Sequence, residues 1–429
     1  MATDIPKSVL TPQHVDLKSM FPDISRSTYL THGFDSYPAK MIPHMARFLI
    51  EKTSRIGQTI LDPFCGSGSV LIESLISGRN AIGVDLNSLA IILSMAKTTT
   101  YDTERLKAQL SEILSRIGKC THPHQYDFPN SDYWFTPATL RKLGAIKVTL
   151  DKYLPKIEDD YAFFWKAVTT SIVRKCSKAD TRGPKPFISK NAREKRAGKH
   201  FDPVKLFELE ANSWICIEQD YVKKLKEVGT DSRIEVIQGD SRKLSKLLKN
   251  RTVDAVVTSP PYLSAQDYYR SSKLQRFVLG DSTPRELMQW SRTIIGSDRL
   301  LANQQLLDET LPCDLAETIK SALINQKHKH SKKNAAIFAK YVMDMAMVLN
   351  QIGLVLKTGS PCVIVLGYNL ISHIVIPTPE VIIQLASKEG FKLKHYYSDK
   401  IRDRWVPTIR NGHKGVIDEE HLLVFEKSV

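Results

Sequence analysis

The feature that most constrains the fold is a glycine-containing turn, DPFCGSG at residues 62–68, which directly follows a short apolar run at residues 59–61. A helix is predicted next at residues 70–77 and a second strand at residues 80–84, with Asp85 at the end of that strand. The order strand, glycine turn, helix, strand and acid is typical of a βαβ unit that binds a nucleotide. This pattern predicts an α/β sheet with a ligand at the carboxyl ends of its strands.

The glycines of this turn, Gly66 and Gly68, permit a ligand to approach the backbone closely, at the start of the following helix. Asp85 is placed to accept hydrogen bonds from both hydroxyl groups of a ribose. Because the turn lacks the complete GxGxxG pattern, a dinucleotide pyrophosphate is disfavoured. Asp240 follows the third predicted strand, at residues 233–238. It is expected either to contact an adenine amino group or to cap a helix.

A second segment, Ser259-Pro260-Pro261-Tyr262, directly follows a predicted strand at residues 253–257. The two prolines fix the backbone and remove two N–H donors. The Ser259 hydroxyl and the Pro260 carbonyl then form an acceptor-rich corner that can hold the N–H groups of an aromatic amine. Tyr262 offers a ring on which a base can stack. The segment predicts chemistry on the amino group of a nucleobase, with a stiff surface loop as the alternative.

Together these segments resemble the S-adenosylmethionine-dependent DNA amino-methyltransferases, which modify cytosine N(4) or adenine N(6). His32, the YPAK segment at residues 37–40 and the tail at residues 400–420 are also similar to that family. The resemblance implies a Rossmann-like methyltransferase sheet with helices on both faces, and S-adenosylmethionine as the cofactor. It also implies that Phe64 packs on the cofactor and Tyr262 on a flipped base. The candidate cofactor-binding residues are Tyr37, Pro38, Asp62, Phe64, Gly66, Gly68, Asp85 and Asp240.

The sheet is predicted to be interrupted by two largely helical insertions, at residues 101–232 and 263–335. The first is the candidate DNA-binding region and the second the candidate target-recognition region, but the sequence leaves open which of them reads bases. The catalytic domain is predicted from residues 1–100, 233–262 and 336–429. Further helices are predicted at 103–117, 137–154, 161–177, 203–227, 335–356 and 378–389, and further strands at 361–366, 392–397 and 421–426.

The net charge of +15 favours a polyanionic partner, because lysine and arginine release counterions from a phosphate backbone. A basic, loop-like stretch from residue 174 to residue 200 is the candidate contact with DNA phosphates, and a merely solvated surface is the alternative. Its candidate residues are Arg174, Lys175, Arg182, Lys190, Arg193, Lys195 and Arg196.

The six cysteines are dispersed singly, with no zinc-like spacing, so we expect free thiols, no metal site and a cytoplasmic protein. Cys65, inside the glycine turn, is expected to pack rather than to act as a nucleophile. Residues 1–20 do not resemble a signal peptide, and no apolar run reaches the roughly 18 residues of a membrane span.

Serine at the first position of the SPPY segment resembles the cytosine-N(4) branch of the family, since adenine enzymes more often carry Asp or Asn there. We therefore expect a DNA cytosine-N(4) methyltransferase, acting on double-stranded DNA beside a separate cognate restriction endonuclease. The alternatives are an adenine-N(6) DNA methyltransferase and an RNA amino-methyltransferase. A nucleic-acid-binding protein on a degenerate methyltransferase scaffold and a protein-glutamine methyltransferase are less favoured.

Overall fold

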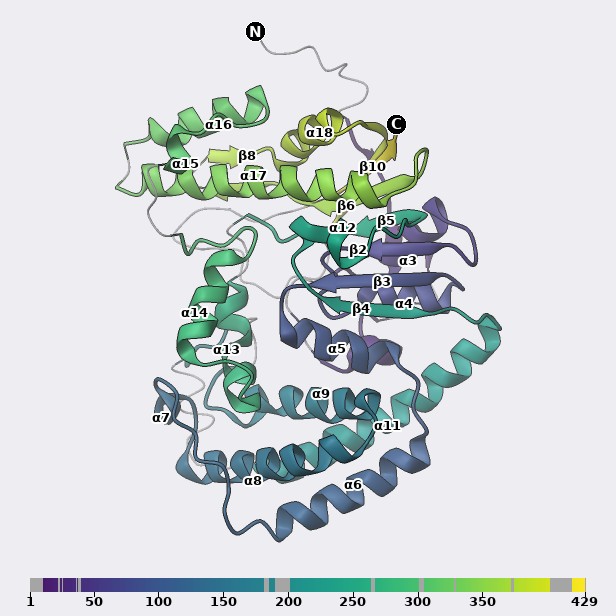
Figure 1. Ribbon diagram of the computed structural model, residues 1–429, viewed down its shortest axis with the longest axis vertical. Coiled ribbons are helices and arrows are strands. Elements are labelled where there is room, and N and C mark those ends of the chain that lie inside the picture. Colours follow the sequence, from purple (N-terminus) through teal and green to yellow (C-terminus); the bar gives the residue numbers. More distant parts are fainter. Residues whose placement is uncertain are drawn as a thin grey trace.

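The computed structural model describes residues 11–21, 24, 26–35, 37, 40–180, 185–189, 201–263, 267–300, 305–327, 329–371, 374–401 and 419–428. Within them, eight strands form one mixed sheet in the order β1-β9-β10-β6-β5-β2-β3-β4 (Figure 1). The strands are β1 (Gln13–His14), β2 (Thr59–Asp62), β3 (Asn80–Asp85), β4 (Ile234–Gln238), β5 (Ala255–Thr258), β6 (Pro361–Leu366), β9 (Phe391–Lys400) and β10 (Glu419–Lys427).

The strand order reverses next to β2, and this reversal places the two conspicuous sequence segments side by side. The chain passes from β2 to β3 and β4 in one direction, and then returns to the other side of β2 as β5. All of these pairings are parallel, so the carboxyl ends of β2 and β5 are neighbours. Open α/β sheets bind ligands at such a reversal. The predicted α/β sheet is thus confirmed, and its strand order reverses at the edge where the ligand site is predicted.

One strand runs against the others. β10 is antiparallel to both of its neighbours, β6 and β9, and its register with β9 shifts between Val424 and Phe425. Because of this direction, β10 begins at the same edge of the sheet where β5 and β6 end. Its first residues therefore lie near the catalytic candidates.

Helices cover both faces of the sheet, as predicted (Figure 1). Side chains that alternate along a strand point to opposite faces. Ile60 of β2 packs with α3 (Pro43–Thr53) and α4 (Ser69–Ile76), whereas Leu61 packs with α12 (Leu244–Leu247) and α17 (Ser331–Val355). The remaining flanking helices are α5 (Ser88–Thr98) beside α4 and α18 (Thr378–Lys388) beside α17.

The first insertion is helical, as predicted, and it builds its own hydrophobic core against α5. Aromatic rings dominate this core: Phe34 stacks on Trp214 with ring centroids 4.4 Å apart, and Trp165 stacks on Phe207. Its helices are α6 (Thr103–Gly118), α7 (Ser131–Trp134), α8 (Pro137–Tyr153), α9 (Asp159–Cys176) and α11 (Pro203–Val228).

The expected basic loop begins later than predicted. Arg174 and Lys175 lie in the last turn of α9, so their assignment to a loop is wrong. Cations in the last turn of a helix interact favourably with its dipole, and the buried face of α9 continues to Cys176. Arg182, Lys190, Arg193, Lys195 and Arg196 lie outside the described residues.

The helices of the second insertion pack in two different hydrophobic cores. Leu274 and Leu287, on the first two of its helices, pack in the core of the first insertion, whereas Ala316 and Leu323 pack with α17 over the sheet. Its helices are α13 (Tyr268–Leu279), α14 (Pro284–Thr293), α15 (Gln305–Asp308) and α16 (Asp314–Ile324). The domain boundaries themselves stay a prediction.

The other elements are short: α2 (Leu17–Met20), η1 (Leu30–Gly33), η2 (Leu154–Lys156), η3 (Ser241–Lys243) and the hairpin of β7 (Asn369–Ile371) and β8 (Ile374–Ile376). In the described part of the chain, no helix combines the length and the apolar character needed to cross a membrane.

Candidate active site

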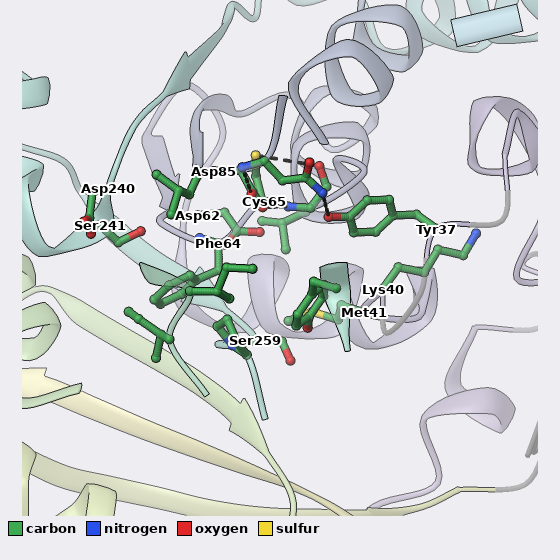
Figure 2. Close-up of a pocket in the computed structure, with 18 of the residues that line it drawn as sticks. Tyr37, Lys40, Met41, Asp62, Phe64, Cys65, Asp85, Asp240, Ser241 and Ser259 are labelled. Carbon is green, nitrogen blue, oxygen red and sulfur yellow. Dashed lines mark hydrogen bonds between the residues drawn. The ribbon is translucent and has the colours of Figure 1, made fainter. Parts of the chain in front are cut away.

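A cavity opens at the carboxyl ends of β2, β3 and β5 (Figure 2). Its space is about 850 Å³ when the open solvent at its mouth is counted. Most of the predicted cofactor residues line it, and so do Ser259 and Pro261. Those from the cofactor prediction are Tyr37, Asp62, Phe64, Gly66, Asp85 and Asp240.

The glycine turn has the backbone conformation that its sequence requires. Gly66 and Gly68 have φ angles of 50° and 85°, in the region that favours glycine. A Cβ atom on Gly66 would lie 3.3 Å from the ring of Tyr37. Asp85 holds the turn, because its Oδ2 accepts a hydrogen bond from the Gly66 N–H at 2.9 Å. The structure thus brings Tyr37, the glycine turn and Asp85 together, as Figure 2 shows.

Asp62 joins the cofactor turn to the catalytic segment. Its Oδ1 accepts hydrogen bonds from the Thr258 hydroxyl at 2.6 Å and from the Phe64 N–H at 3.1 Å. Thr258 is the last residue of β5 and immediately precedes Ser259. The two segments are at least 191 residues apart in the chain. One buried carboxyl group therefore connects them in the folded structure.

The electrostatics of the cavity suit a polar ligand that carries positive charge. Burial raises the pKa of Asp62 to about 7 and that of Asp85 to about 6, against the opposing effect of their hydrogen bonds. A nearby cation would restore the ionised forms. In addition, the hydroxyl of Ser69, the first residue of α4, lines the cavity and is buried without a hydrogen-bond partner. A ligand with hydroxyl or carboxylate groups and a sulfonium centre therefore fits these residues.

Asp240 caps a helix, which is the second of the two roles predicted for it. It caps η3 by accepting a hydrogen bond from the Arg242 N–H, and its carboxylate is also paired with the Arg242 guanidinium, Nη2 to Oδ2 at 2.7 Å. The carboxylate still borders the cavity, opposite Tyr37 and Lys40 in Figure 2. The contact with an adenine amino group stays a prediction.

The catalytic segment is only partly exposed to the cavity. Ser259 and Pro261 line it, Pro260 is buried, and Tyr262 is half-buried outside the lining. The Tyr262 hydroxyl instead lies 3.4 Å from Oε1 of Glu420 at the start of β10. Stacking of Tyr262 on a base stays a prediction, and Pro38 lies outside the described residues.

The second insertion contributes residues that the sequence patterns do not indicate. Trp290, from α14, and Tyr268, from α13, line the cavity together with residues 293–295. Arg242 joins this wall to the cofactor side, since its Nη2 donates to the Thr293 carbonyl at 3.1 Å. These residues are isolated in the sequence, without a motif or a period, so no local signal identifies them.

The segment that carries Tyr37 is anchored by a buried polar network around Glu73 of α4. The Glu73 carboxylate contacts His32 at 2.8 Å, Arg47 at 2.9 Å and the Tyr29 hydroxyl. Lys40, which lines the cavity, donates to the His32 carbonyl at 3.0 Å. This network therefore fixes the positions of His32 and Lys40, two residues of the segments that resemble the family's cofactor motif.

Cys65 packs against Leu71 and Ala81, and burial raises the pKa of its thiol well above the ordinary value. A thiol held neutral in this way is a poor nucleophile, in agreement with its predicted packing role. Within the described ranges, no cluster of three or more His, Cys, Asp or Glu side chains could hold a metal ion.

Comparison with known proteins gives matches to methyltransferases of DNA and of RNA. A family model described as DNA methylase matches residues 4–95. The type II methyltransferase M.MvaI of Kocuria varians is 29% identical over 426 residues, which cover 93% of this chain and 91% of that protein. M.MjaII of Methanocaldococcus jannaschii is 25% identical over 56% of this chain and 60% of its own length. M.BsoBI of Geobacillus stearothermophilus is 25% identical over 60% of this chain and 55% of its own.

Proposed function

Because this chain belongs to the S-adenosylmethionine-dependent DNA amino-methyltransferases, we propose that it methylates the exocyclic N(4) amino group of a flipped-out cytosine in double-stranded DNA. The observation that carries the proposal is the shared cavity, in which Ser259 borders the same space as the glycine turn. A methyl donor on the turn and an amine at Ser259 would therefore meet without a covalent enzyme intermediate.

The chain's own residues have distinct roles in this proposal. Asp85, Ser69 and the Gly66 turn hold the cofactor, which supplies an electrophilic methyl group. The Ser259 hydroxyl and the Pro260 carbonyl accept hydrogen bonds from the amino group, so that the nitrogen lone pair faces the methyl group. Catalysis then rests on orientation and on the exclusion of water from a buried cavity.

The serine at position 259 is what favours cytosine over adenine. A serine hydroxyl is a shorter acceptor than the side chain of the Asp or Asn more frequent in adenine enzymes, so it makes a different contact with the amino group. Adenine N(6) is the second candidate, since the acceptor corner would hold either amine.

The experiment is to incubate the enzyme with unmethylated genomic DNA and isotope-labelled S-adenosylmethionine, and to analyse the nucleosides by mass spectrometry. We expect labelled N(4)-methylcytosine. Labelled N(6)-methyladenine would overturn the choice of base, and the absence of any labelled DNA nucleoside, with labelled RNA instead, would overturn DNA as the substrate. A Ser259→Ala variant serves as the control for contaminating activity.

We further propose that the enzyme protects DNA from a separate cognate endonuclease, because the relatives above are named type II methyltransferases. Arg174 and Lys175 stay candidate phosphate contacts. Lys175 forms an ion pair with Glu210 of α11, and Arg174 donates to the Asp180 carbonyl at 2.9 Å. Both partners would have to be exchanged for phosphate, so we expect the cations at residues 182–196 to contribute more to DNA binding.

A further inference from the structure

Methylation of a neutral amine leaves the nitrogen with one proton too many, and the acceptor corner has no basic group to receive it. The amine lone pair forms the new C–N bond, while the electron pair of the broken C–S bond stays on sulfur as a thioether. Charge balance then requires the nitrogen to lose a proton. The Ser259 hydroxyl and the Pro260 carbonyl can accept hydrogen bonds, but neither is a base of useful strength.

Three carboxyl groups border the cavity, and each already accepts hydrogen bonds that stabilise its ionised form. Asp62 accepts from Thr258 and from the backbone, Asp85 accepts from two backbone N–H groups, and Asp240 is paired with Arg242. Their hydrogen-bond partners are backbone N–H groups, Thr258 and Arg242, and within the described part of the chain none of the three is hydrogen-bonded to Ser259 or Tyr262. These groups therefore suit the binding of the cofactor better than the removal of a proton through the hydroxyls of the catalytic segment.

Glu420 differs from these three groups. It stands at the start of β10, where the antiparallel direction of that strand brings it to the catalytic edge of the sheet. Its Oε1 lies 3.4 Å from the Tyr262 hydroxyl, and the Tyr262 hydroxyl also interacts with the Ser259 hydroxyl. Hydrogen bonds of this kind are often long before the substrate binds. The hydroxyls of Ser259 and Tyr262 thus lie between the amine position and a carboxylate that is largely withdrawn from water.

We propose that Glu420 is the terminal proton acceptor of methyl transfer, acting through the hydroxyls of Tyr262 and Ser259. This inference rests on the proposed function. The amine proton passes to Ser259 Oγ, the Ser259 proton to Tyr262 Oη, and the Tyr262 proton to the Glu420 carboxylate. Each hydroxyl loses one proton and gains one, so only the amine and Glu420 change charge. Glu420 does not touch the substrate, and its role is that of a positioning and proton-accepting group behind Tyr262.

The surroundings of Glu420 match this role. Burial, and then the neighbouring charge of its cross-strand partner Asp399, raise the pKa of Glu420 to about 7. Among the residues that the structure describes, Tyr262 is the other titratable group that faces Glu420, and Tyr268 stands close to Tyr262. A carboxylate with this basicity can take a proton near neutral pH and release it after turnover.

The test compares Glu420→Gln with Glu419→Gln under single-turnover conditions on DNA. Glu419 precedes Glu420 on β10 and faces the opposite side of the strand, near His421, so it controls for the loss of a charge on that strand. We expect Glu420→Gln to slow methyl transfer at least tenfold, with an unchanged dissociation constant for S-adenosylmethionine and an unchanged melting temperature. The rise in the wild-type rate with pH around neutrality should disappear in Glu420→Gln and persist in Glu419→Gln.

A second variant separates proton transfer from stacking. Tyr262→Phe keeps the ring and removes the hydroxyl, so it should slow the reaction as much as Glu420→Gln, and the double variant should be no slower than either. A Glu420→Gln enzyme with the wild-type rate and pH profile would overturn the proposal, as would strictly additive effects in the double variant. A complete lack of methylated DNA with wild-type enzyme would instead point to the failure of the proposed function.

Discussion

At the scale of single residues, the site depends on carboxyl groups that are largely withdrawn from water. Asp62, Asp85 and Glu420 all lie near the cavity, and burial is the main reason that their pKa values are raised. Burying such groups costs free energy unless hydrogen bonds or a bound cation compensate. Their presence at one edge of the sheet therefore indicates binding and catalysis rather than stability.

Asp85→Ala tests the cofactor side of the site. The change would remove the proposed ribose contacts, worth about 1.5–3 kcal/mol each, and it removes the support of the Gly66 N–H. We expect calorimetry to show S-adenosylmethionine binding weakened at least tenfold. Glu112→Ala, on the exposed surface of α6, is the control and should bind normally. Unchanged affinity in a folded Asp85→Ala protein would contradict the assignment.

Glu218 of α11 gives a test of stability against pH, because it is fully buried and accepts a hydrogen bond from the Tyr101 N–H at 2.9 Å. Burial raises its pKa from 4.5 to about 8. Between about pH 4.5 and about pH 8, the Glu218 carboxyl group is protonated in the folded protein and ionised in the unfolded chain. The contribution of Glu218 to stability therefore falls as the pH rises through this range. Glu218→Gln imitates the protonated form.

Relative to wild type, Glu218→Gln should therefore gain stability as the pH increases from about 5 to about 8, by at most about 1.4 kcal/mol per pH unit. Chemical denaturation at several pH values measures this difference. Glu208→Gln, exposed on the same helix, should follow the wild-type curve. Parallel curves for wild type and Glu218→Gln would show that Glu218 does not hold its proton.

At the scale of elements, the turn that follows α14 packs closely against the catalytic segment. Gly296 has a φ angle of 75°, and a Cβ atom there would lie 2.9 Å from the Tyr262 carbonyl oxygen. Gly359 also has a φ angle of 75°, but a Cβ atom there would have no neighbour within 4 Å. Comparison of Gly296→Ala with Gly359→Ala therefore separates two effects. Both variants place an alanine in the left-handed region, but only Gly296→Ala brings a Cβ atom against the backbone of the catalytic segment.

We expect Gly296→Ala to lower kcat at least tenfold more than Gly359→Ala does. Both variants should lose about 1–2 kcal/mol of stability, because an L-residue is strained in this region. Thermal unfolding and steady-state kinetics measure the two effects. Equal kcat values in the two variants would show that α14 does not brace the catalytic segment.

The elements themselves were largely predictable from the sequence. Glycine, proline and capping residues mark their ends, so α4, α6 and α8 begin and end within two residues of the prediction. The two-residue β1 and the β7–β8 hairpin were missed, because such short elements carry too little periodicity. The cavity wall from Trp290 to Ile295 was missed for another reason. It depends on contacts between distant parts of the chain, which leave no local pattern.

At the scale of the whole molecule, the excess of positive charge is the property that bears on DNA. Reversal of Arg193, Lys195 and Arg196 to glutamate should weaken binding to target and non-target duplexes alike. Removal of one phosphate interaction should reduce the slope of log K against log salt by roughly 0.9. Fluorescence anisotropy at several salt concentrations measures both effects. A variant with the wild-type affinity and salt slope would leave the second insertion as the better candidate.

The position of β10 also has a consequence for biosynthesis. β10 lies between β6 and β9, and it is translated after both of them. Until it emerges from the ribosome, β6 is left with an unpaired edge and β9 can pair only with the short β1. Until β10 is added, the nascent sheet therefore consists of two separate parts. Since β10 also carries Glu420, we expect a ribosome-bound chain stalled before residue 419 to bind chaperones and to leave DNA unmethylated.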